Sequence, residues 1–189
     1  MSERRPPDFA MLRAVEILAS LHERVRNAEN SPPEPIDEPI LLASPALTLQ
    51  IARTKRTEVE RVLGAGFSYP ARGWHTYAID ERGERCLLSA FYKNAILVAA
   101  EIYFPLGPRA PKLRAYDAGG FALEPPGVRV GMRAAAIASP FAPAIGGPAK
   151  VVYDAAYEAR FPGGVAYAMG AKGIVQRLTL YADLRGDVE

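Results

Sequence analysis

The sequence predicts an α+β fold in which a unit of one helix and three antiparallel strands occurs twice, behind an N-terminal helix. Two observations predict it. Segments rich in aromatic and branched residues are separated by short polar turns, which is typical of antiparallel strands, and apolar positions recur at a fixed interval along the chain. The two units are expected to form one curved antiparallel sheet with the helices on one face. With 189 residues, 49% of them hydrophobic, the chain can bury such a core.

The first 30 residues are predicted to form an amphipathic helical arm. Apolar residues recur every three or four positions from Phe9 to Val25, and Asp8 can cap the helix. Residues 31–46 contain a proline run that cannot continue a helix, so they are interpreted as a proline-rich linker. An arm on such a linker can dock on its own body or exchange with a second copy, which makes a homodimer through the N-terminal helix one expectation.

The first predicted unit covers residues 47–105. It starts with a short strand candidate and a helix that Gly64 ends, at 47–51 and 54–63. Three strands are then predicted because polar turns separate aromatic and branched segments, at 74–79, 86–92 and 96–104. Strands joined by such short turns form an antiparallel meander.

The second predicted unit covers residues 128–189, after a connection rich in proline and glycine at 106–127. A weak short helix that Pro140 ends is followed by three strand candidates, at 133–139 and at 151–157, 165–169 and 174–184. The turns between them contain glycine. The second unit is therefore predicted to repeat the order of the first.

An offset of 78 residues aligns the two predicted units without a net gap. It places apolar positions of the helix and of the last strand opposite each other, pairing Val59 with Ile137, Leu63 with Phe141, Ile96 with Ile174, Ile102 with Leu180 and Tyr103 with Tyr181. Duplicated packing requires such matching positions. The alternative is a chance alignment of two amphipathic patterns.

The repeated unit resembles a known structural type. Val128-Arg-Val-Gly-Met before a short helix and a meander, and Val62-Leu63-Gly64 at the end of the first helix, resemble the helix-then-strands unit of the beta-lactamase inhibitor protein and of the small outer-membrane assembly lipoproteins. The second unit departs from the pattern, with Phe141-Ala-Pro in place of the Leu-Gly step. The resemblance covers roughly residues 47–184 and implies a sheet with one free face, which clamps a partner protein in the inhibitor family. Both families are exported.

The candidate site residues are aromatic residues on predicted strands. Tyr and Trp supply large, rigid contact area at low entropic cost, so they concentrate at protein-binding surfaces. Tyr153 and Tyr157 are separated by an even number of positions and are expected to share a face. The sequence thus predicts a protein-binding surface formed by Trp74, Tyr77, Tyr153 and Tyr157. The alternative is that these side chains fill the core.

The sequence predicts neither a metal site nor a catalytic site, and no cofactor. Two histidines, His22 and His75, and one cysteine, Cys86, are too few for a zinc site. No nucleophile elbow or dinucleotide-binding glycine loop is present. The formal net charge of +2 is too small to favour binding to nucleic acid or to a membrane surface.

The compartment is predicted from cysteine use and hydropathy. A single cysteine cannot form an intramolecular disulfide, which is typical of a reducing environment. The longest apolar stretch, residues 95–100, is shorter than the roughly 20 residues that cross a bilayer. We therefore expect a soluble, cytoplasmic protein.

The sequence favours a noncatalytic protein-binding module, such as an inhibitor or immunity-like protein that occludes a partner with an aromatic sheet face. One alternative is a small enzyme or ligand-binding domain with a pocket between helices and sheet. A second is a structural protein that self-assembles through its N-terminal arm. A pocket with converging His75, Cys86 or acidic groups favours ligand chemistry, whereas a concave aromatic sheet favours a partner protein.

Overall fold

A computed structural model describes residues 35–69, 74–81, 84–104, 116–117, 119–143, 153 and 155–182. Strands make up 56% of this structure and helices 9%. The α+β prediction, with helices packed on one sheet face, is therefore wrong, because the described fold is mostly β. The predicted arm at residues 1–30 lies outside the described residues.

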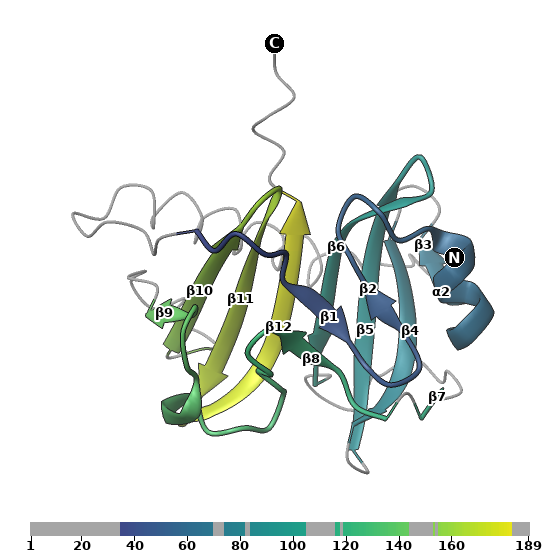
Figure 1. Ribbon diagram of the computed structural model, residues 1–189. Helices are drawn as coiled ribbons and strands as arrows, with labels where there is room; N and C mark the ends of the chain where they lie inside the picture. Colours follow the sequence, from purple (N-terminus) through teal and green to yellow (C-terminus); the bar gives the residue numbers. More distant parts are fainter. Residues whose placement is uncertain are drawn as a thin grey trace, which may run out of the picture.

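Most strands belong to one nine-stranded sheet, which curves across the molecule in Figure 1. Its order is β3-β4-β5-β6-β12-β11-β10-β9, with β7 beside β4. All neighbours pair antiparallel except β7 with β4, so the predicted antiparallel sheet is confirmed. The strands are β3 (Phe67–Tyr69), β4 (Trp74–Glu81), β5 (Glu84–Lys93), β6 (Ile96–Tyr103), β7 (Tyr116–Asp117), β9 (Ala142–Pro143), β10 (Ala155–Phe161), β11 (Gly164–Ala171) and β12 (Ile174–Ala182).

A second, three-stranded sheet lies across one face of the large sheet, in front of β5, β6 and β12 in Figure 1. Its order is β2-β1-β8, with β1 at Leu41–Ala43, β2 at Thr48–Leu49 and β8 at Ala122–Glu124. Leu42, Leu49 and Leu123 are fully buried in the same core cluster as the large sheet's Leu88 and Leu178. The small sheet is therefore one wall of the main hydrophobic core.

Short strands lie in two segments that the sequence predicted to be connections. Strand β1 lies in residues 31–46, which were interpreted as a linker, and β7 and β8 lie in the predicted connection 106–127. Proline and glycine in these segments exclude a helix, but two or three residues between them still pair as strands, and Leu42 and Leu123 are buried. The composition therefore concealed strands that are too short to show a period.

Two meanders, β4-β5-β6 and β10-β11-β12, meet where β6 pairs with β12. In this seam Glu101 pairs with Thr179, 78 residues further along the chain. The same interval relates the isolated bridges Lys55–Ile96 and Arg133–Ile174, the hydrogen bonds Arg56 N to Ala95 O and Ala134 N to Gly173 O, and the bulges after Phe91 and after Met169. The two halves of the sheet thus share one backbone plan, related by a pseudo-two-fold axis through the seam.

The halves differ in their helices. The first has α2 (Arg56–Leu63), whose Glu58 carboxylate accepts a hydrogen bond from the Lys55 backbone N–H at 2.9 Å. The second has only the 3₁₀-helix η1 (Ala134–Ala136), which has no acidic residue in its first turn and is followed by Pro140. The helix predicted at 133–139 is therefore replaced by a single turn. None of the helices in the described residues is long and apolar enough to cross a membrane.

The matched hairpin tips give a test of the repeated backbone plan. Ala95 has a φ of 62° and its counterpart Gly173 a φ of 76°. A positive φ destabilises an L-residue by roughly 1 kcal/mol. Replacing that residue by glycine removes this cost, but glycine also gains entropy in the unfolded chain, which cancels part of the stabilisation. Chemical denaturation should therefore show that Ala95→Gly raises the free energy of unfolding by about 0.5 kcal/mol and that Gly173→Ala lowers it by about 1 kcal/mol. A loss of stability in both variants would contradict a shared turn.

Candidate functional site

The face of the large sheet that points away from the small sheet carries a continuous row of polar side chains. Alternation along the strands places one such residue on each central strand, and the pairing registers connect them from β4 to β10. In strand order they are Thr76, Ser89, Glu101, Thr179, Tyr167 and Glu158, and we call them the polar row. Each is at most 4% exposed. The face that the sequence predicted to be free is thus lined with buried polar groups.

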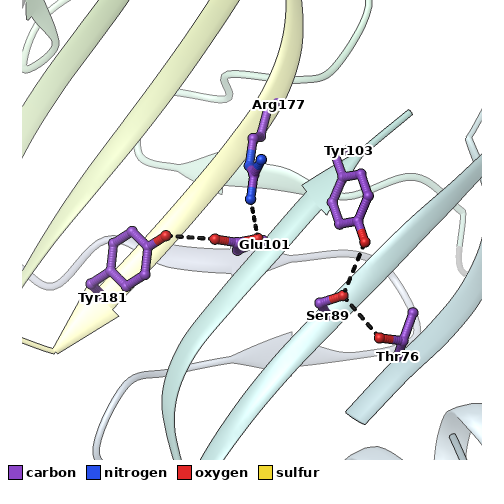
Figure 2. A network of polar contacts seen from close by, with 6 residues as sticks. All are labelled: Thr76, Ser89, Glu101, Tyr103, Arg177 and Tyr181. Atoms are coloured by element: carbon purple, nitrogen blue, oxygen red, sulfur yellow. Dashed lines mark hydrogen bonds and ion pairs between the residues drawn. The ribbon is translucent and has the colours of Figure 1, made fainter. Parts of the chain in front are cut away.

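Hydroxyl groups in the first half of the polar row are paired with one another. Thr76 Oγ1 and Ser89 Oγ lie 3.0 Å apart, and Ser89 Oγ lies 3.4 Å from the Tyr103 hydroxyl (Figure 2). Each hydroxyl can donate one bond and accept others, so such a chain satisfies its members in turn. These three hydroxyls therefore form one connected network.

A buried ion pair crosses the seam between the halves (Figure 2). Arg177 on β12 donates from Nη2 to Glu101 Oε2 on β6, and the Tyr181 hydroxyl donates to Glu101 Oε1 at 2.6 Å. The guanidinium carbon of Arg177 also lies 5.1 Å from the centre of the Tyr103 ring, within the range of a cation–π contact. Both oxygens of the Glu101 carboxylate therefore accept a hydrogen bond.

Burial and charge fix the protonation of this group. Burial lowers the pKa of Arg177, but the Glu101 carboxylate together with Tyr181 and Tyr153 outweighs that effect, and the pKa is raised overall. Burial raises the pKa of Tyr181 well above its usual value, and the nearby Glu101 carboxylate raises it further. At neutral pH the seam thus contains a guanidinium and a neutral phenol, both hydrogen-bonded to Glu101.

Several polar atoms in or beside the second half of the polar row have no hydrogen-bond partner. Glu158 Oε1 accepts a hydrogen bond from Arg160 Nε at 2.5 Å, but Glu158 Oε2 has no hydrogen-bond partner. Thr179 Oγ1 and Arg177 Nε are also buried without one. We call these three atoms the unpaired set. Leaving a buried polar group unpaired costs about 1–3 kcal/mol, so such atoms point to a missing partner.

The spacing of the carboxylates argues against acid–base hydrolysis on this face. Glu101 and Glu158 are three strands apart, about 14 Å at roughly 4.8 Å per strand. Glycoside hydrolases place their two carboxyl groups about 5–9.5 Å apart. Each carboxylate is also paired with an arginine. No group of three potential metal ligands from histidine, cysteine and acidic residues occurs among the described residues.

The four aromatic residues predicted to bind a partner do not come together on one surface. Trp74 lies on the polar-row face, 9% exposed, with its ring 5.4 Å from that of Phe91. Tyr77 is on the opposite face and belongs to the main core, against which Tyr157 also packs. Tyr153 lies before β10 begins and packs near Met169. The odd spacing of Trp74 and Tyr77 already separates them in a strand.

Sequence reasoning missed the polar row and its ion pair. Arg177, Thr179 and Tyr181 alternate with leucines along β12, a pattern that is typical of a solvent-exposed strand face. Glu101 follows two alanines and looks like an isolated charge. The one signal was this glutamate inside an otherwise apolar strand, because a buried carboxylate requires partners.

A second cluster of titratable groups lies on the core face near α2. The rings of His75 and Tyr92 meet edge to face, with centroids 5.3 Å apart. Burial, and then the charge of Arg56, lowers the pKa of His75, while burial raises the pKa of Tyr77 and of Tyr92. Both tyrosine hydroxyls are buried without a hydrogen-bond partner. These residues belong to the hydrophobic core, so the cluster is interpreted as packing.

Comparison with known proteins leaves the chemistry of the site as the basis for interpretation. No family model matches the chain, and no curated protein or solved structure is significantly similar to it. The resemblance to the beta-lactamase inhibitor protein and the outer-membrane assembly lipoproteins therefore stays a prediction.

Two threonines in the polar row test whether the unpaired set is real. Thr179→Val removes a buried hydroxyl that has no partner, so it should raise the free energy of unfolding by about 1 kcal/mol. Thr76→Val removes a hydroxyl paired with Ser89 and should lower it by about 1 kcal/mol. Both side chains are buried in the same sheet, and urea denaturation compares them directly. Equal destabilisation would mean that the Thr179 hydroxyl is hydrogen-bonded.

The buried imidazole predicts a pH dependence of stability. Because folding lowers the pKa of His75 below 6.5, the unfolded chain binds more protons under mildly acidic conditions, and stability should fall as the pH drops from about 7 to 5. His75→Phe keeps the ring contact with Tyr92 but cannot titrate, so the fall should be smaller. Urea denaturation at several pH values measures both slopes. Identical slopes would show that His75 does not contribute.

Proposed function

We propose that the protein is a noncatalytic binding protein that holds a small polar molecule against the second half of the polar row. The observation that carries this proposal is the unpaired set: Glu158 Oε2, Thr179 Oγ1 and Arg177 Nε are buried without hydrogen-bond partners. Buried polar groups in native proteins are nearly always hydrogen-bonded, to protein, water or ligand. A bound molecule would supply the partners.

The contrast between the halves supports a specific site. In the first half, Thr76, Ser89 and Tyr103 form a connected chain of hydroxyls. In the second half, Glu158 and Thr179 of the row, and Arg177 beside Thr179 on β12, each have one atom without a hydrogen-bond partner. On the polar-row face the unpaired atoms thus lie in the second half, which supports a binding site there. Functional sites are where such local rules are broken.

A small molecule accounts for this face better than a partner protein does. Protein interfaces depend on exposed aromatic anchors, but Trp74 and Tyr77 are both buried. Among the described residues, Phe67 is the one large hydrophobic side chain that is exposed. The noncatalytic binding role expected from the sequence is therefore retained, with a small ligand in place of the inhibited partner.

Thermal-shift assays with a mixed panel of neutral, zwitterionic and charged small molecules test the proposal. A ligand present at about 100 times its dissociation constant should stabilise the wild-type protein by roughly 2.7 kcal/mol, which raises Tm by several degrees. The shift should shrink in Thr179→Val and Glu158→Gln. It should be unchanged in Glu60→Gln, a matched carboxylate change on the partly exposed face of α2.

Two outcomes would overturn the proposed function. One is a panel in which no compound stabilises the wild-type protein. The other is a stabilising compound whose effect is the same in wild type, Thr179→Val and Glu158→Gln, since that compound would bind elsewhere. Recovery of a stoichiometric protein from a pull-down, together with either outcome, would favour the protein-binding alternative instead.

A further inference from the structure

We infer that the molecule held at the unpaired set is neutral and polyhydroxylated, of the saccharide or polyol class. This inference rests on the proposed function and adds the chemistry of the ligand. It follows from the charge balance of the face, from the kind of hydrogen bond that each unpaired atom can make, and from the placement of those atoms on the strands.

Charges on this face already compensate one another. Arg177 is paired with Glu101 across the seam, and Arg160 is paired with Glu158 on β10. Glu101, Glu158 and Arg177 are each less than 10% exposed. A ligand with a net charge would therefore be buried beside ion pairs that are already complete, and an uncompensated buried charge is strongly disfavoured. The balance favours a neutral ligand.

The unpaired atoms require a ligand that both donates and accepts. Glu158 Oε2 can only accept a hydrogen bond, Arg177 Nε can only donate one, and Thr179 Oγ1 can do either. A hydroxyl group also does either. A molecule with several hydroxyls can therefore satisfy all three atoms without carrying a charge, whereas an ammonium or a carboxylate alone satisfies one kind only.

Their placement requires hydroxyls at more than one position. Thr179 and Arg177 are on β12 and Glu158 is on β10, with β11 between them. The two outer strands are about 10 Å apart, and the side chains extend from the same face of both. Met169 on β11 is buried between these strands, with Tyr153 and Tyr181 packed against it, so the surroundings of the set are partly apolar. A polyhydroxylated ring offers polar groups around an apolar body, which fits this combination.

An amino-acid zwitterion is the main competitor. Its carboxylate could accept from Arg177 and its ammonium could donate to Glu158, so its hydrogen-bond pattern is also complementary. It would, however, add a second anion to an arginine that Glu101 already neutralises and a second cation to a glutamate that Arg160 already neutralises. Those added charges lose their hydration with little new compensation.

Isothermal titration calorimetry of the full chain distinguishes these ligands. D-glucose, maltose and myo-inositol are titrated separately at millimolar concentration, with glycine and L-serine as zwitterionic probes. At least one of the polyhydroxylated probes should bind, with a dissociation constant that is insensitive to added NaCl because the ligand is neutral. Glu158→Gln and Thr179→Val should each weaken that binding about tenfold. Thr76→Val, the matched hydroxyl deletion in the first half, should leave it unchanged.

The other outcomes are separable. Binding of glycine or L-serine alone, with an affinity that falls as salt is added, would overturn the polyhydroxyl class but leave the proposed function standing. Binding of none of these probes would overturn the inferred class, and the mixed thermal-shift panel then decides whether the proposed function fails as well. Binding of a sugar that is equally tight in Glu158→Gln and Thr179→Val would place it away from the unpaired set and also overturn the inference.

Discussion

The pairing of β6 with β12 is the constraint on which the rest of the structure depends. It joins two meanders into one sheet, and the buried Glu101–Arg177 ion pair crosses it. Removing one partner from a buried pair typically costs about 3–5 kcal/mol, because the other charge is left without compensation. The Tyr181 hydroxyl donates a hydrogen bond to the other oxygen of the Glu101 carboxylate. This seam therefore fixes the relation of the two halves and holds Arg177 with its Nε atom unpaired.

The two halves of the large sheet share one backbone plan but carry different side chains on the polar-row face. At equal distances from the seam, the first half places Ser89 and Thr76 where the second half places Tyr167 and Glu158. The Thr76 and Ser89 hydroxyls are hydrogen-bonded to each other, whereas Glu158 keeps one carboxylate oxygen without a hydrogen-bond partner. The two halves thus combine one backbone frame with different polar side chains.

The long strands and their turns could be predicted from the sequence. The packing of a small sheet on the large one could not. The strand predicted at 96–104 is found at Ile96–Tyr103, because turn residues and branched side chains act locally. Strands β1 and β8 were missed because each is three residues long and gains its stability from tertiary packing, whereas β2 lies inside the strand predicted at 47–51. The polar row depends on the registers of five strand pairings, so no local pattern could reveal that Glu101 and Thr179 are neighbours.

A double-mutant cycle on Glu101 and Arg177 tests the central claim most directly. The free energy of unfolding is measured for wild type, Glu101→Gln, Arg177→Met and the double variant. If the ion pair holds the seam together, each single change should cost about 3–5 kcal/mol and the double change should cost at least about 2 kcal/mol less than their sum. Additive costs would show that the two side chains do not interact, and the seam would then depend on its backbone pairing alone.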